Sequence, residues 1–187
     1  MRSQRTLFFE GFKKLGTKEF GGSLINGHPR VARPISTKRA MHIVMRSSMA
    51  KGSRSFLQPA RAKRLSLLVK KLGKEKGVKV YRFANSGNHL HLLIQPSSRQ
   101  AYLHFVRAFS GLVARVTLGK ERGKALTSEE LKKKLKEASK TFWDARPFSR
   151  IVEWGREFKI VSGYVEQNAL EALGFMPYRP RGSYSSA

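Results

Sequence analysis

The 187-residue sequence contains no cysteine, which excludes disulfide bonds and thiolate-bound zinc. It also lacks any long uninterrupted apolar run, and no signal-like apolar segment follows the first methionine. We therefore expect a protein that neither spans nor anchors in a membrane and that stays in the cytoplasm. Any metal ion it binds must be held by His, Asn, Gln, Asp or Glu side chains.

Acidic residues are scarce as well. Only 12 Asp and Glu stand against 38 Lys and Arg, which gives a formal net charge of +26 at pH 7 and an isoelectric point near 11.2. A surface this basic attracts polyanions, and nucleic acid is the usual partner. The length suits one domain with a core and some extensions. We expect a nucleic-acid-binding domain, and a membrane surface is the weaker alternative partner.

Three segments are expected to lie outside the core of that domain. Residues 1–38 are rich in Gly, Arg and Lys and predict a basic, partly ordered arm. Residues 119–141 predict a Lys-rich helical insert, and residues 175–187 predict a basic, mobile tail. The domain itself is therefore predicted to span residues 39–174.

Within the domain, the apolar residues alternate between the period of a strand and that of a helix. Strands are predicted at about 39–47, 78–84, 88–94 and 148–154, and helices at about 60–76, 98–118 and 155–173. Asn85-Ser86-Gly87 lies between the second and third strands and indicates a hairpin. The order β-α-β-β-α-β-α predicts an α+β fold of the ferredoxin-like type, an antiparallel sheet with helices packed on it.

His89 and His91 flank Leu90 in the third predicted strand. Side chains alternate along a strand, so both imidazoles point to one face while Leu90, Leu92 and Ile94 point to the other. Two imidazoles side by side can hold one metal ion between them. Nitrogen ligands favour manganese or heavier metals over magnesium, whereas magnesium is the more abundant ion in cells. Magnesium and manganese are both kept as candidates.

Tyr164 and Asn168 lie four residues apart in the last predicted helix, on one side and at the edge of its apolar stripe. If this helix packs on the imidazole face, both approach His89 and His91. A metal ion held by His89, His91 and the Asn168 carbonyl oxygen would polarise a phosphodiester. Tyr164 would then attack the phosphorus and form a covalent phosphotyrosine. Such a linkage retains the energy of the broken bond, which suits strand transfer better than digestion.

These residues carry a family resemblance. His89-Leu90-His91 matches the His-hydrophobic-His (HUH) motif, and Tyr164 with Asn168 matches the Tyr-x-x-x-Asn/Gln helix of single-tyrosine HUH transposases. Residues 35–175 resemble insertion-sequence members of that family, and most the REP-associated tyrosine transposases, because position 168 is Asn. The resemblance implies an HUH endonuclease fold and a transposase that binds single-stranded or hairpin DNA. It also implies cleavage with magnesium or manganese and attachment of Tyr164 to the 5′ end, by a monomer or a homodimer.

The sequence also suggests roles for several residues outside these two motifs. Arginines that flank the predicted strands are expected to contact DNA phosphates, namely Arg46, Arg82, Arg146 and Arg150. His42 on the first strand either points into the site or is structural, and the structural role is favoured. His104 is expected to have no role. Gly163 costs a helix about 1 kcal/mol relative to Ala. It either gives DNA room beside Tyr164 or forms a packing notch, and the notch is slightly favoured.

A second class of function fits the same order of elements. A non-catalytic RRM-like protein that binds RNA or DNA would use aromatic side chains of its sheet for base stacking, with Tyr81 and Phe83 as candidates. That hypothesis gives His89, His91 and Asn168 no role. A replication initiator or relaxase would use HUH chemistry too, but usually carries further domains. A covalent DNA adduct distinguishes the enzymes from the binding protein.

Overall fold

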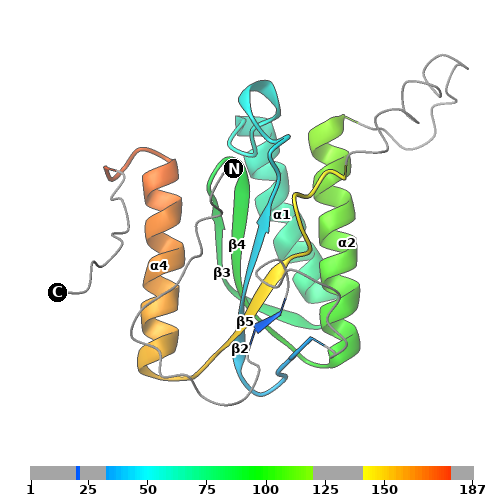
Figure 1. Ribbon diagram of the computed structural model, residues 1–187, viewed down its shortest axis with the longest axis vertical. Coiled ribbons are helices and arrows are strands. Elements are labelled where there is room, and N and C mark those ends of the chain that lie inside the picture. The colour runs from blue at the N-terminus through cyan, green and yellow to red at the C-terminus, as the bar shows by residue number, and fades with distance from the viewer. Residues whose placement is uncertain (1–19, 22–32, 120–140, 178–187) are drawn as a thin grey trace, which may run out of the picture.

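The computed structural model describes residues 20–21, 33–119 and 141–177 of the chain. Most of the predicted arm (1–38), nearly all of the insert (119–141) and most of the tail (175–187) lie outside the described residues. Their predicted properties stay predictions. Within the described residues the α+β fold is confirmed, and Figure 1 shows a sheet with helices on both of its faces.

The predicted strands and helices are present, with bounds within two residues of those expected. The elements are β1 (Phe20–Gly21), β2 (Ala40–Arg46), η1 (Gly52–Arg54), α1 (Pro59–Glu75), β3 (Val78–Asn85), β4 (His89–Pro96), α2 (Arg99–Leu118), β5 (Phe148–Val152) and α4 (Arg156–Ala172). In the described part of the chain, none of the helices has the length and apolar character needed to cross a membrane.

The sheet is antiparallel, and its strand order is β1-β5-β2-β4-β3. The four longer strands follow the ferredoxin-like arrangement that the sequence predicted. The difference is β1, a two-residue strand inside the predicted basic arm, for which the sequence predicted no strand. It pairs with β5, with Phe20 opposite Arg150.

The hairpin between β3 and β4 forms as predicted. The Ser86 backbone nitrogen donates to the His89 carbonyl oxygen at 2.9 Å, and the Gly87 nitrogen donates to Asn85 Oδ1 at 3.1 Å. Gly87 has a φ of +83°, in the left-handed region that other residues adopt at a cost. This turn fixes the register of β4, and the register decides which of its side chains reach each face.

One face of the sheet carries the main hydrophobic core beneath α1 and α2. Its buried residues include Met41, Ile43, Met45, Leu90, Leu92 and Ile94 from the strands and Leu65, Val69, Phe105 and Phe109 from the helices. Ser98 caps α2 as predicted, because its side chain accepts from the Ala101 nitrogen at 3.0 Å. Burial of each large apolar side chain contributes about 1.5–3 kcal/mol, so this face carries much of the stability.

The opposite face is covered by α4, which Figure 1 places on the other side of the sheet from α1 and α2. Val161 and Val165 of this helix belong to a second apolar cluster that includes Ala40 and Leu93 of the strands. Leu93 lies two residues beyond His91 and therefore on the same face. The helix that carries Tyr164 thus packs on the imidazole face of the sheet.

The two aromatic residues considered for base stacking both take part in internal packing. The Tyr81 ring lies edge-on to Trp154 with centroids 5.6 Å apart, and the Phe83 ring lies edge-on to Phe109 at 6.4 Å. Both belong to β3, an edge strand, and helices cover both faces of the sheet. This arrangement differs from the open central strands that an RRM presents to RNA.

Candidate active site

The two histidines of the HUH motif lie side by side on β4. Across the ladder to β2, His89 is opposite Arg46 and His91 is opposite Val44. The imidazole centroids of His89 and His91 are 4.9 Å apart. His91 is only 1% exposed, whereas His89 is half-buried, so solvent and ligands reach the pair from the His89 side.

A neighbour in the hairpin orients His89. Its Nδ1 lies 2.8 Å from Asn88 Oδ1, an oxygen that can only accept a hydrogen bond. In this pair Nδ1 carries the proton, so Nε2 offers the lone pair that binds a metal. Asn88 was not singled out from the sequence, although a polar residue directly before the motif was a signal that could have been used.

A third imidazole, that of His42 on β2, joins the site. His42 Nε2 lies 3.2 Å from His91 Nδ1, and the two rings are nearly parallel, 8° apart, with centroids separated by 5.4 Å. Burial, with a smaller contribution from Arg150, lowers the pKa of His42 from 6.5 to about 3, so this ring is neutral at pH 7. The sequence favoured a structural role and left open that His42 points into the site, and the ring does point into it. We call His42, His89 and His91 the imidazole cluster.

Tyr164 approaches this cluster from α4. Its ring lies edge-on to His91, with centroids 5.6 Å apart and planes at 85°, and edge-on to His42 at 5.9 Å and 82°. The side chain is half-buried at the border between helix and sheet. The fold therefore brings the tyrosine and the histidines together within one chain.

Asn168 lies one turn beyond Tyr164 and is buried. Its Nδ2 donates to the Tyr164 carbonyl oxygen at 2.6 Å. This bond uses one hydrogen of the amide NH2 group, and the expected metal ligand is the other polar atom of the same amide, its carbonyl oxygen. Its role as the third ligand stays a prediction.

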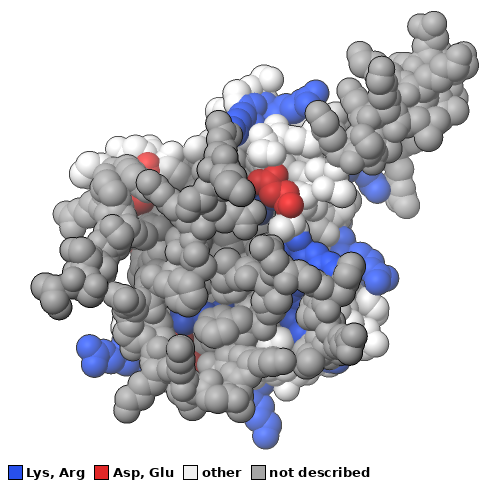
Figure 2. Space-filling view, in the orientation of Figure 1, with Lys and Arg blue, Asp and Glu red and all other residues white. Residues whose placement is uncertain are grey.

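Three of the four predicted DNA-contacting arginines are exposed. Arg46 lies across the ladder from His89 with 68% of its side chain exposed, Arg82 lies on the same face, and Arg146 lies in the segment before β5. Of these three arginines, Arg46 is nearest in register to the imidazole cluster. On the face that Figure 2 shows, described Lys and Arg side chains lie at several separate points, so positive charge on this face is not confined to one patch.

Arg150 is in a different environment. Its side chain is 11% exposed and forms an ion pair at 3.0 Å with Glu157, which is 16% exposed. Arg150 is opposite His42 in the register of β2 and β5, and its charge acts on that buried ring. It therefore presents much less surface to a phosphate than the sequence led us to expect.

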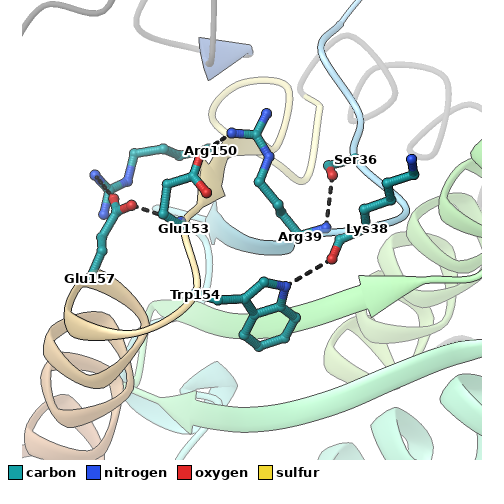
Figure 3. A network of polar contacts seen from close by, with 7 residues as sticks. All are labelled: Ser36, Lys38, Arg39, Arg150, Glu153, Trp154 and Glu157. Atoms are coloured by element: carbon teal, nitrogen blue, oxygen red, sulfur yellow. Dashed lines mark hydrogen bonds and ion pairs between the residues drawn. The ribbon is translucent and has the colours of Figure 1, made fainter.

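Glu157 also links the start of α4 to the preceding strand, as Figure 3 shows. Its Oε2 accepts from the Glu153 backbone nitrogen at 2.7 Å, and Glu153 pairs in turn with Arg39. Next to them, the Trp154 indole nitrogen donates to the Lys38 carbonyl oxygen at 2.8 Å. These contacts fix the first turn of α4 to the residues just before β2, and they thereby position Tyr164, seven residues after Glu157 and about two turns further along the helix.

Replacing Glu157 tests this link. We expect Glu157→Gln to lower the free energy of unfolding by about 3 kcal/mol, because it removes the carboxylate from a largely buried ion pair. Glu166→Gln is the matched control. Glu166 is 61% exposed and its ion pair with Arg82 is long, at 4.0 Å, so the substitution should lower the free energy of unfolding by less than about 1 kcal/mol. Urea unfolding of both variants measures the difference, and equal small changes would contradict a stabilising pair.

His89 and His91 fit a divalent ion that takes several further ligands from elsewhere. In the ranges 33–119 and 141–177, no group of three or more His, Asp or Glu side chains is arranged to hold a metal. The candidate metal ligands are the imidazole nitrogens of His89 and His91, and the Asn168 amide oxygen is the expected third ligand. Such a set suits manganese or magnesium whose remaining ligands are water and phosphate oxygens.

Among solved structures, the chain is similar to a REP-associated tyrosine transposase bound to a REP hairpin. The identity is 9% and the TM-score 0.49, over 81% of each chain. It is also similar to a protein from Deinococcus radiodurans R1 that is assigned as a transposase, with 15% identity and a TM-score of 0.42 over 74% of this chain and 97% of the other. None of the curated protein sequences matches the chain.

A family model decides the relationship. The model described as "Transposase IS200 like" matches residues 36–168, from just before β2 to Asn168 in α4. This range holds the imidazole cluster and Tyr164, and it covers most of the 187 residues. The chain therefore belongs to the IS200-like transposases, a family of enzymes that cut and join DNA.

Proposed function

We propose that this protein is a site-specific single-strand DNA endonuclease and strand transferase with Tyr164 as its nucleophile. The observation that carries the proposal is the edge-on packing of the Tyr164 ring against His91 and His42, at 5.6 and 5.9 Å. A nucleophile on one element and metal-binding nitrogens on another meet only because α4 covers the imidazole face. The Asn at position 168 favours the REP-associated group within the family.

The proposed reaction is a substitution at phosphorus. The Tyr164 hydroxyl oxygen bonds to the phosphorus and the bond to the 3′ oxygen breaks, which leaves a 5′-phosphotyrosine and a 3′-hydroxyl. The phenol proton is lost and the departing 3′ oxygen gains one, so charge and atoms balance. Attack of another 3′-hydroxyl on the phosphotyrosine reverses the step and joins the strand to a new end.

The side chains around Tyr164 have distinct tasks in this proposal. His89 and His91 would hold manganese or magnesium, and Asn168 would add its amide oxygen. When bound, the ion supplies positive charge that offsets the anionic phosphate oxygens. Arg46, exposed beside His89, binds the adjacent phosphate by charge-assisted hydrogen bonds.

We propose unpaired or hairpin DNA as the substrate, met in the cytoplasm on the nucleoid. Tyr164 is half-buried between helix and sheet, so the scissile phosphate must come close to the protein surface. A flexible single strand meets this requirement more readily than a stiff duplex. Because one chain supplies both the tyrosine and the imidazoles, a monomer suffices for cleavage, and a homodimer stays compatible with the reaction.

The proposal is tested with labelled single-stranded DNA from the flanks of the gene, incubated with the protein and Mn²⁺. We expect a protein–DNA adduct that survives a denaturing gel, and mass spectrometry should find the nucleotide on the peptide that contains Tyr164. The same sequence as a blunt duplex serves as the comparison and should give little adduct. Tight binding without any adduct would favour a non-catalytic DNA-binding protein instead.

Gly163 provides a second test of where DNA approaches. A Cβ built on Gly163 has no atom within 4 Å, so the residue is not a packing notch, contrary to the reading that the sequence slightly favoured. We expect Gly163→Ala to stabilise α4 by up to about 1 kcal/mol while slowing cleavage, because the added methyl group lies beside Tyr164. Thermal unfolding and adduct formation measure the two effects.

Gly111 is the matched control for Gly163. It lies inside α2, is exposed, and likewise has no atom within 4 Å of an added Cβ. Gly111→Ala should stabilise the protein by a similar amount and leave cleavage unchanged. If both variants cleave at the rate of the wild type, DNA does not approach α4 at Gly163.

A further inference from the structure

His42 lies in the imidazole cluster, and the proposed chemistry gives it no task. In the register of β2 and β4 it is opposite Leu93, so it is the diagonal neighbour of His91 on the same face. Its ring bridges that diagonal, and its Nε2 lies 3.2 Å from His91 Nδ1. Both side chains are buried, at 6% and 1% exposure, so this contact is shielded from water.

A contact between two imidazole nitrogens has only two forms. One nitrogen must carry the hydrogen and the other must accept it. If His42 donates, the proton of a neutral His91 is on Nε2, and that nitrogen has no lone pair for a metal. If His91 donates from Nδ1, its Nε2 has the lone pair. Metal binding by His91 Nε2 therefore requires that His42 be the acceptor.

His42 is poorly placed to be a ligand itself. Its Nε2 is directed at His91 Nδ1, and the described histidines and carboxylates provide no three-residue metal group. A residue that accepts the second N–H of a metal-bound histidine fixes the tautomer and the ring orientation of that ligand, and raises its basicity. Asn88 occupies the corresponding place at Nδ1 of His89, at 2.8 Å.

We propose that His42 is a positioning residue that holds His91 with its proton on Nδ1 and presents His91 Nε2 to the metal ion. This inference rests on the proposed function, since it assumes that His89 and His91 hold a divalent ion. Loss of such a partner typically weakens metal affinity about 10- to 100-fold. The two HUH histidines are then each oriented by a different neighbour, His89 by its own hairpin and His91 by the adjacent strand.

Two variants of His42 separate this role from simple packing. His42→Phe keeps a planar ring but removes the acceptor, whereas His42→Gln places an amide oxygen near the position of Nε2. We expect the Mn²⁺ affinity of the full chain, measured by electron paramagnetic resonance, to fall about 10- to 100-fold in His42→Phe. The Gln variant should recover most of this loss, and His104→Phe, in exposed α2 surface, should bind like the wild type.

The tautomer of His91 can also be measured directly in the metal-free wild type. This test does not depend on whether a His42 variant folds. Nitrogen-15 correlation spectra of the imidazole rings should place the His91 proton on Nδ1. A proton on Nε2, or equal Mn²⁺ affinities for wild type and His42→Phe, would overturn the inference and leave the proposed function standing. Absence of Mn²⁺ binding by the wild type would instead overturn the metal site, and the inference with it.

Discussion

The Tyr164→Phe variant should form no covalent DNA adduct and should cleave more than about 10³-fold more slowly than the wild type. The change deletes only the oxygen that bonds to phosphorus, and removing the nucleophile of a covalent mechanism removes the step itself. The aromatic ring stays, so its edge-on contacts with His91 and His42 are kept. We therefore expect the fold and the affinity for single-stranded DNA to change little. Single-turnover adduct formation and fluorescence anisotropy measure these two quantities.

Tyr81→Phe is the control for this prediction. The Tyr81 ring is also packed at the interface of β3 and α4, and its hydroxyl donates to Gln95 Oε1 at 2.7 Å. Losing this hydrogen bond should cost about 1 kcal/mol of stability and leave the adduct intact. An adduct that persists in Tyr164→Phe and maps to another residue would show that the nucleophile has been misassigned.

The sequence predicted most of this fold because its local patterns are regular. In β2 and β4 the large apolar residues of the main core recur at every second position, and the helices have continuous apolar stripes with a recognisable cap at Ser98. The two-residue strand β1 carries no such pattern. It forms only because the edge of β5 is available for pairing in the folded sheet, and local sequence does not show that contact.

The same distinction explains the candidate site. That His89 and His91 share a face follows from the period of a strand alone. The stripe of α4 shows which side of that helix is buried, but not which face of the sheet it covers. The contact between His42 and His91 depends on the register between two strands, which a single sequence does not reveal.

Charged residues show the limit of sequence reasoning most clearly. Arg150 and Arg46 both flank strands and seemed equivalent as phosphate contacts. Both arginines pair with a carboxylate in the fold, but Arg150 is 11% exposed in its pair with Glu157 of α4, whereas Arg46 stays 68% exposed although it lies 3.6 Å from Asp144. Whether the ion pair of an arginine is buried or exposed is decided by packing between elements, and spacing along the chain does not record it.

The largest effect on metal-dependent chemistry is expected from His89→Ala. We expect Mn²⁺ affinity and the rate of adduct formation to fall by more than about 100-fold, because one of only two imidazole ligands is lost. His89 is half-buried, so its removal should disturb the fold much less than removal of His91, whose side chain is almost fully buried. DNA affinity without metal should be retained, since the basic surface that attracts phosphates is unchanged.

Raising the Mn²⁺ concentration discriminates a binding defect from a structural one in His89→Ala. If the imidazole serves as a ligand, saturating Mn²⁺ should restore part of the rate, whereas a misplaced Tyr164 would not respond. His104→Ala is the matched control, because His104 is exposed on α2 and lies away from the imidazole face. It should retain the Mn²⁺ dependence of the wild type. Cleavage by His89→Ala at wild-type rates under limiting Mn²⁺ would mean that the ion binds elsewhere, and that proximity of Tyr164 to His91 is packing alone.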